Sequence, residues 1–229
     1  MPKFIRFAGK AVAFFALIAT FLVLHPVNAF ASQYGYAAGF DADDIDTRRS
    51  AYWMDYYMDK SGYGTALYNN ISASSTYNQI PGDDVAGIFS HANAGFITVL
   101  NNGDTEYIIA GKGGEQNQSD AYYISTYDSN DISDLNFWVF GGCETAKTSS
   151  TYGDILGMCY DKGVDSTMAF YDNLVAPSTN TDDYMNYYFK SFFMFAYSGC
   201  NVQTCAIWAM DNYYTEYGSY DGFDSWQLI

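Results

Sequence analysis

Short apolar runs bounded by turn residues constrain the fold of this chain most strongly. Such runs at 84–89, 132–140 and 164–170 have the length of buried β-strands. Helix-like stretches alternate with them and carry apolar residues at three- and four-residue spacing, at 48–58, 154–160, 184–197 and 202–214. Strands that alternate with helices predict an α/β domain with a mostly parallel central sheet.

Local signals mark where several of these elements begin and end. Thr47 and Asn201 are suitable N-caps for the helices that follow them, and Gly62 ends the first helix. Three segments between the elements are expected to lack regular structure: a Gly- and Asp-rich lead-in at 32–45, a polar connection at 69–81 and a loop at 111–120.

A β-hairpin is expected after the first buried strand. The runs 96–100 and 105–110 are strand-like, and Asn101-Asn102-Gly103-Asp104 separates them. Asn-Gly between two such runs is a strong hairpin signal, because both residues tolerate the positive φ angles of a tight turn.

The first 31 residues have the three parts of a secretory signal peptide. Lys3, Arg6 and Lys10 make the start basic, an apolar run follows at 11–24, and Ala29-Phe30-Ala31 has the small-x-small pattern of a cleavage site. The run is shorter than the roughly 20 residues of a bilayer span, which leaves an uncleaved anchor as the alternative. We therefore expect a signal peptide at 1–31, one domain at 32–229, and a secreted or extracellular protein, with the cell surface as a variant of that location.

The charge of the chain is strongly acidic. It has 26 acidic and 10 basic residues, and the expected leader holds three of the basic residues and none of the acidic ones. Such a surface repels phosphates, so neither nucleic acid nor, after cleavage, a membrane is an expected partner. It favours cationic ligands, including Lys- or Arg-rich peptides. The 23 tyrosines fit either a carbohydrate-binding surface or half-buried positions with one apolar and one wet end.

Two residues that follow buried strands carry the functional prediction. His91 follows the run at 84–89 and is the only histidine beyond the leader, while Cys143 follows the run at 132–140 after two glycines. In parallel sheets, functional residues gather past the carboxyl ends of the strands. A thiol and an imidazole there can act as nucleophile and general base. A single histidine and the absence of Cys-x-x-Cys spacing argue against a zinc site, and no cofactor is expected.

The surroundings of these two residues resemble a known family. The order strand–Ser90-His91, hairpin, strand–Gly142-Cys143-Glu144-Thr145-Ala146 is similar to the caspase-like (clan CD) cysteine peptidases, which include gingipains, legumains and metacaspases. The nearest likeness is to bacterial CHAT-type and gingipain-like domains. The likeness covers roughly residues 84–210 and includes the segments 169–172, 188–189 and 199–202.

The resemblance implies a fold, an activity and a set of roles. The fold is a caspase-like three-layer sandwich with a mostly parallel central sheet and a β-hairpin insertion after the histidine strand. His91 is implied as general base and acid and Cys143 as the nucleophile that forms an acyl-enzyme on a peptide or protein substrate. The backbone N–H groups of Ala92 and Cys143 are implied as the oxyanion hole.

The chain departs from the family pattern at two positions. Ala92 follows the histidine where the family usually has glycine, and Gly141 stands where metacaspases often have an acidic residue that binds a basic substrate side chain. Asp172, just after the next strand, is the candidate substrate-binding residue in its place.

Other interpretations of the same residues remain open. A lone cysteine or histidine is often a structural core residue, so a catalytically silent fold that acts as a secreted binding module is the alternative function. No Gly-x-Ser-x-Gly motif supports a serine hydrolase. Cys159 is expected in the core, and Cys200 and Cys205 either form a disulfide or place Cys205 in the core.

Overall fold

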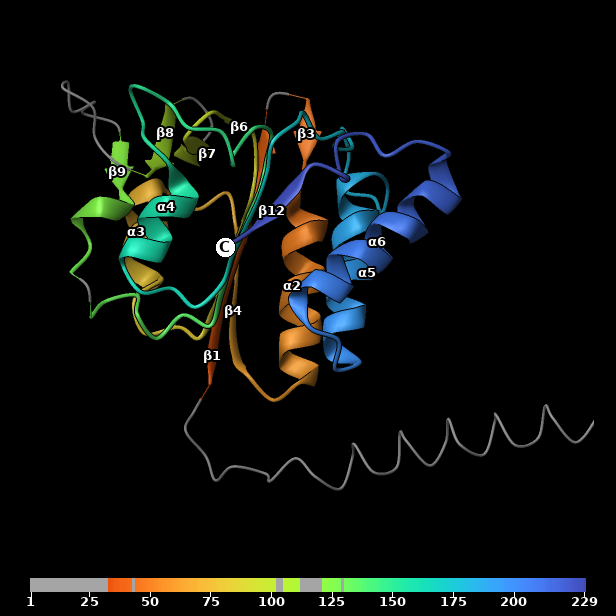
Figure 1. Ribbon diagram of the computed structural model, residues 1–229, viewed down its shortest axis with the longest axis horizontal. Helices are drawn as coiled ribbons and strands as arrows, with labels where there is room; N and C mark the ends of the chain where they lie inside the picture. Colours follow the sequence, from red (N-terminus) through yellow and green to blue (C-terminus); the bar gives the residue numbers. More distant parts are fainter. Residues whose placement is uncertain (1–32, 43, 102–104, 112–120, 129) are drawn as a thin grey trace, which may run out of the picture. The chain divides into compact units, whose positions relative to one another are not determined.

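The computed structural model describes residues 33–229 apart from 43, 102–104, 112–120 and 129. These residues form one unit, Gln33–Ile229, with a central sheet between two outer layers (Figure 1). The expected leader, the tip of the expected hairpin and most of the expected loop at 111–120 lie outside the described residues.

The central sheet has six strands, and all but one run parallel to their neighbours. β12 pairs antiparallel with β11 at one edge, so the sheet is mixed. Chain order reverses between β1 and β5, which is the place where sheets of this kind open a crevice at the carboxyl ends of the strands. The order across the sheet is β4 (Gly64–Asn69), β1 (Tyr34–Gly39), β5 (Val85–Phe89), β10 (Phe137–Gly141), β11 (Thr167–Phe170) and β12 (Trp226–Leu228).

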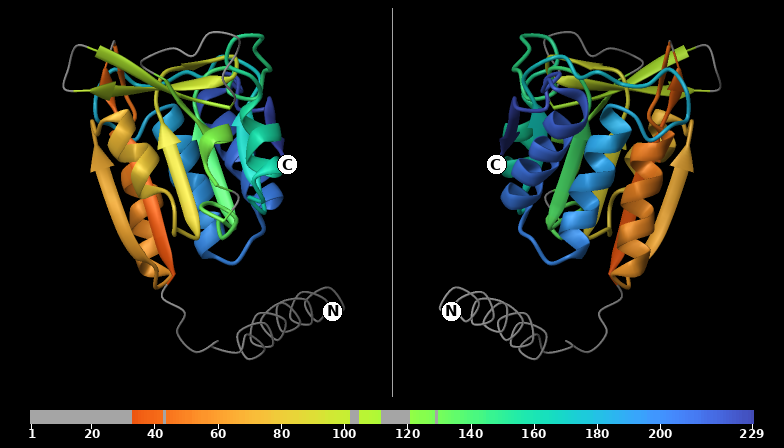
Figure 2. Two further views of the ribbon diagram at one scale, coloured as in Figure 1. Left: turned by 90° about the vertical axis from the view of Figure 1, so that its left-hand side faces the viewer. Right: turned by 90° about the vertical axis from the view of Figure 1, so that its right-hand side faces the viewer.

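Helices cover both faces of the sheet (Figures 1 and 2). One face packs against α2 (Arg48–Lys60), α5 (Met185–Tyr197) and α6 (Val202–Tyr217). The other packs against α3 (Ala73–Gln79), α4 (Ile155–Asp161) and the short 3₁₀ helix η1 (Ile124–Thr126). The result is an α/β three-layer arrangement, as the alternation of apolar runs and helical stretches predicts.

A second, four-stranded sheet lies at the carboxyl end of the central sheet. It contains β6 (Ala92–Asn93), β7 (Phe96–Asn101), β8 (Thr105–Ala110) and β9 (Ala121–Tyr123) in that order. β7 and β8 pair antiparallel from Phe96↔Ala110 to Asn101↔Thr105, which confirms the predicted hairpin after the histidine strand. A two-stranded ribbon, β2 (Asp41–Ala42) and β3 (Ile45–Asp46), lies between β1 and α2 in the chain.

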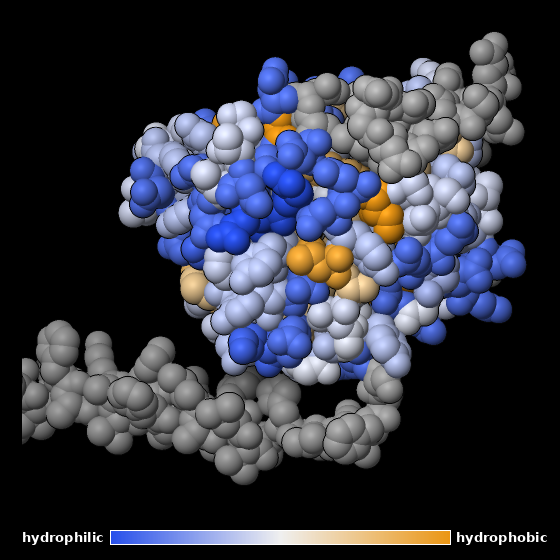
Figure 3. All heavy atoms as spheres, turned by 180° about the vertical axis from the view of Figure 1, so that it is seen from behind, coloured by the Kyte–Doolittle hydropathy of each residue, from blue (hydrophilic) through white to orange (hydrophobic). Residues whose placement is uncertain are grey.

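Side chains of β10 alternate between the two cores. Trp138 and Phe140 are buried on the α3/α4 side, whereas Phe137 and Val139 are buried on the α2/α5/α6 side. A parallel strand that is covered on both faces is apolar at every position, which is why this segment reads as a continuous apolar run. At the surface, the face drawn in Figure 3 is mostly hydrophilic and shows only small strongly hydrophobic patches.

Two expectations of irregular chain are wrong. The lead-in at 32–45 contains β1, a buried central strand, and the connection at 69–81 contains α3, whose N-cap Ser72 accepts a hydrogen bond from the N–H of Ser75. β1 consists of Tyr, Gly and Ala and lacks a recognisable apolar run. Its Gly35 gives space to the side chain of Met58 on α2, so small residues are needed there for the helix to pack closely.

Other boundaries differ by a few residues from those expected. The strands predicted at 132–140 and 164–170 begin at Phe137 and Thr167. Thr47 does stand at the N-cap of α2, but its hydroxyl makes no cap hydrogen bond. It bonds instead to Phe40 and to the carbonyl of Phe89, and so joins the ends of β1 and β5. Asn201 caps α6 as predicted, by accepting from the N–H of Thr204.

None of the helices within the described ranges combines the length and the hydrophobicity that a bilayer span requires.

A half-buried carboxyl before β5 predicts a pH-dependent contribution to stability. Burial, followed by the neighbouring charge of Asp84, raises the pKa of Asp83 to about 7. The folded protein therefore holds this proton more tightly than the unfolded chain, whose aspartates titrate near pH 4. The contribution of Asp83 to the free energy of unfolding is consequently largest below about pH 4 and is lost as the pH rises through about 7.

We expect Asp83→Asn to flatten this decline. Asp83 is only half-buried, so solvent screens it and the effect is moderate. We expect the free energy of unfolding of Asp83→Asn, relative to that of the parent protein, to be about 1 kcal/mol higher at pH 8 than at pH 5. Urea unfolding at both pH values measures it, with the exposed Asp211→Asn as the control for removing one negative charge. An equal pH dependence in both variants would rule out Asp83 as the source.

Candidate active site

The structure brings the segments that carry His91 and Cys143 together at the carboxyl edge of the sheet. His91 follows β5 and Cys143 follows β10, and these two strands are parallel neighbours with Phe89 opposite Gly141. The N–H of Ser90 donates to the carbonyl of Gly141, the last residue of β10, at 3.1 Å, so the hydrogen bonding continues one residue past the end of β5.

The alternation of the strands places the two residues with respect to the sheet. A Cβ at Gly141 would meet Phe89 and Phe189 on the α5 side, and a Cβ at Gly142 would lie 2.6 Å from the Cβ of Ala92 on the opposite side. The next residue, Cys143, returns to the α5 side and packs against that core. His91 lies in the segment between β5 and β6 and is half-buried.

Gly142 permits the close approach of the two strand ends. Besides the contact with Ala92, a side chain here would come within 2.8 Å of the carbonyl oxygen of Ser90. Only hydrogen fits in this space, so the glycine before the cysteine is required by packing between the histidine segment and the cysteine segment.

The thiol of Cys143 is half-buried and contacts the backbone of Leu174. The Leu174 N–H donates to Sγ at 3.3 Å, and Sγ lies 3.7 Å from the Leu174 carbonyl oxygen, to which the thiol can donate. Burial raises the pKa of Cys143, the Leu174 N–H lowers it, and the nearby charge of Glu144 raises it. The thiol therefore needs a base to become a nucleophile at neutral pH.

Glu144 is itself held in place beside the thiol. It adopts a positive φ of 56°, and its carboxylate pairs with Lys147 at 2.6 Å. This ion pair keeps the acidic side chain engaged away from Sγ, although its charge still acts on the thiol.

The backbone N–H of Ala92 is oriented away from the second sheet. Ala92 lies opposite Ile97, and the N–H of Thr98 donates to the carbonyl of His91 at 2.7 Å. This pattern marks Ala92 and Ile97 as a non-hydrogen-bonded pair, in which the N–H points away from the partner strand. The Ala92 N–H is therefore not used in the pairing of β6 with β7.

Asp172 lies at the same edge of the sheet, just after β11. The N–H of Glu144 donates to the Asp172 carbonyl oxygen at 3.1 Å, and the Asp172 N–H donates to Ser225 Oγ at 3.0 Å. The residue is exposed. The structure thus places all of the predicted site residues on three adjacent strand ends, those of β5, β10 and β11.

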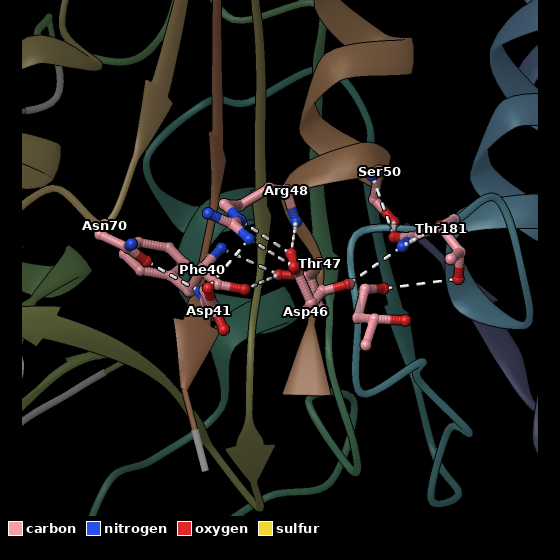
Figure 4. Close-up of polar contacts among 10 residues, drawn as sticks. Phe40, Asp41, Asp46, Thr47, Arg48, Ser50, Asn70 and Thr181 are labelled. Atoms are coloured by element: carbon pink, nitrogen blue, oxygen red, sulfur yellow. Dashed lines mark hydrogen bonds and ion pairs between the residues drawn. The ribbon is translucent and has the colours of Figure 1, made fainter. Parts of the chain in front are cut away.

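A polar network at the end of β1 supports this edge and was not anticipated from the sequence (Figure 4). The buried Asp46 accepts two hydrogen bonds from the guanidinium of Arg48, at 2.9 and 2.6 Å, and Arg48 also pairs with Asp41 at 2.9 Å. The only sequence signal for this network is that Thr47-Arg48 follows several acidic residues. This pattern indicates a buried ion pair only when the preceding segment is a buried strand.

The four cysteines are all free thiols. Cys159 is buried on α4, as expected. Cys200 and Cys205 do not form a disulfide. Cys205 is buried in the core and donates to the carbonyl of Cys200 at 3.5 Å, so the core alternative applies. Within the described part of the chain, no three His, Cys, Asp or Glu side chains group closely enough to hold a metal ion.

A scan against protein-family models gives no match for this chain, and a comparison with curated protein sequences finds no similar protein.

Proposed function

We propose that this chain is a secreted cysteine peptidase of caspase-like fold that hydrolyses peptide bonds through His91 and Cys143. The observation that carries the proposal is the position of both residues at the carboxyl ends of neighbouring, in-register strands, β5 and β10. The three-layer architecture and the hairpin after the histidine strand also support it.

The proposed reaction begins with proton transfer from Cys143 to His91. The thiolate attacks the peptide carbonyl, and the resulting oxyanion accepts hydrogen bonds from the N–H groups of Ala92 and Cys143. His91 then donates its proton to the leaving amine, which leaves a thioester. Water, deprotonated by His91, hydrolyses the thioester and restores the free thiol.

Asp172 is the proposed contact for a basic substrate side chain. Its carboxylate is exposed, and its backbone is hydrogen-bonded to the residue that follows the nucleophile. A carboxylate held close to the nucleophile favours substrates with a Lys or Arg side chain near the scissile bond, because the charges are opposite.

A second candidate function is a catalytically silent binding module. One observation favours it: the pKa of the Cys143 thiol is raised, and both polar groups of Leu174 face Sγ. In that case the protein binds a cationic or carbohydrate partner without turning it over.

Labelling with a peptide electrophile distinguishes the two functions. A peptidyl acyloxymethyl ketone is expected to modify Cys143, and His91→Ala is expected to slow this modification at least about 100-fold because the thiolate is no longer generated. Mass spectrometry of the intact protein and of its peptides measures the rate and the site. An unchanged rate in His91→Ala would show that the imidazole does not activate the thiol. Absence of labelling, together with binding to a cell-wall fraction that persists in Cys143→Ala, would favour the binding module.

A further inference from the structure

A cavity of about 310 Å³ lies at the opposite edge of the central sheet from the candidate active site. Val85 and Phe137, the first residues of β5 and β10, are part of its wall, whereas His91 and Cys143 follow the last residues of the same strands. Six aromatic rings contribute to the lining: Tyr57, Tyr63, Phe137, Phe192, Phe193 and Tyr197. A concave, largely apolar space of this size with a few polar groups is typical of a small-molecule site.

The polar groups of the lining are all uncharged. They include the amide of Asn136, the hydroxyl of Ser61 and the thiol of Cys200, and among the described residues of the lining there is no lysine, arginine, aspartate or glutamate. The ligand therefore meets no fixed cation that would repel a positive charge. The aromatic faces present negative charge density to it.

The ends of three helices lie at this cavity, and their charges offset one another. Residues of the last turns of α2, which ends at Lys60, and of α5, which ends at Tyr197, line the cavity, and so does Val202, where α6 begins. The carboxyl end of a helix carries partial negative charge and the amino end partial positive charge, and Lys60 adds a cation in the last turn of α2. The preference for a cation therefore rests on the aromatic rings and on Asp84.

Asp84 supplies a full negative charge behind the wall. Its carboxylate accepts hydrogen bonds from the N–H of Tyr34 at 2.8 Å and from Nδ2 of Asn136 at 3.5 Å. Its charge also acts on Tyr63, whose pKa is raised first by burial and then by Asp84. Asn136 of the lining thus contacts this carboxylate, and the charge of Asp84 also acts on the Tyr63 side chain of the lining.

We propose that this cavity binds a small organic cation with an apolar body, of the quaternary ammonium class. The aromatic rings bury the apolar part, and the rings and Asp84 stabilise the positive charge. A site that uses several aromatic rings and a nearby carboxylate discriminates a cation from a neutral molecule of the same shape. This site is separate from the His91 and Cys143 chemistry and does not depend on it.

Calorimetric titration of the purified protein with two matched probes tests the proposal. Benzyltrimethylammonium is the cation, and neopentylbenzene is its neutral isostere. We expect the cation to bind at least about tenfold more tightly, a ratio within reach of cation–π contacts with several rings. Equal affinities would overturn the cation assignment, and no binding of either probe would overturn the site.

Two variants locate the binding. Ala196→Phe fills the cavity and is expected to weaken binding of the cation at least about tenfold. Tyr63→Leu keeps an apolar side chain but removes a ring face, so we expect it to reduce the preference for the cation over the isostere by about threefold. Tyr160→Leu, at an exposed tyrosine on α4, is the matched control and should bind both probes like the parent protein. If Tyr63→Leu and Tyr160→Leu have the same effect on this preference, the cation does not occupy the cavity.

Discussion

Replacement of Cys143 by alanine is expected to lower the rate of peptide hydrolysis by at least about 10³-fold. The proposed mechanism has no other nucleophile at the carboxyl edge, and the loss of a catalytic nucleophile leaves only the contribution of binding and the oxyanion hole. His91→Ala is expected to have an effect of the same order, because His91 is the only histidine beyond the expected leader. The double variant should be about as slow as either single variant, since the two residues act as a unit.

The measurement is the initial rate of cleavage of a fluorogenic peptide library with varied basic and neutral residues. Cys159→Ala is the thiol control. Its side chain is buried on α4, on the other side of the sheet, so we expect rates within about twofold of the parent protein. Cleavage that persists in Cys143→Ala would assign the activity to another residue. If the parent protein cleaves no peptide of the library, the peptidase proposal fails. The binding module, which the raised pKa of the Cys143 thiol favours, is then the better candidate function.

Replacement of Asn186 is expected to cause the largest loss of stability among the polar substitutions considered. Asn186 is fully buried on α5, and its amide makes four hydrogen bonds. Oδ1 accepts from the N–H and the hydroxyl of Ser50, at 3.0 and 2.6 Å. Nδ2 donates to the carbonyls of Asp46 and Thr181, at 2.9 and 2.7 Å (Figure 4). This one side chain joins α2, α5, the β2–β3 ribbon and the loop before α5.

We expect Asn186→Ala to lower the free energy of unfolding by about 3 kcal/mol, because buried donors and acceptors lose their partners. Asn186→Leu, which keeps the branched shape and the number of heavy atoms and leaves no cavity, should cost a similar amount and so separates lost hydrogen bonds from a cavity. Urea unfolding measures both. Asn78→Ala, at an exposed position of α3, should change stability by less than about 0.5 kcal/mol. A loss below 1 kcal/mol in both Asn186 variants would show that the network does not stabilise this edge.

The segments that the sequence predicts well are those whose local pattern agrees with their environment. The apolar runs that become β5, β10 and β11 are buried on both sides of the sheet, so almost every position lacks a polar side chain and the pattern is visible without the fold. The hairpin of β7 and β8 is predictable for a different reason. Its turn chemistry is local and restricts the chain to one reversal.

The missed segments are those whose structure depends on distant contacts. β1 is a run of tyrosine, glycine and alanine, and only the approach of α2 explains its small residues. β12 has three residues and is held by pairing with β11 at the edge of the sheet. Neither has enough local preference to be recognised, since strand propensity largely reflects packing against neighbours.

The same division applies to the candidate site. The sequence by itself determined that His91 and Cys143 each follow a buried strand, because an apolar run that stops at a polar residue or a glycine is a local property. Only the tertiary structure decided that β5 and β10 are direct neighbours, that Gly142 lies against Ala92, and that Leu174 lies against the thiol. Cys143 and Leu174 are 31 residues apart in the chain, and β5 and β10 are separated by the whole second sheet. Which of these segments meet is determined by side-chain volume and hydrogen bonding between them, and no local sequence pattern records such distant contacts.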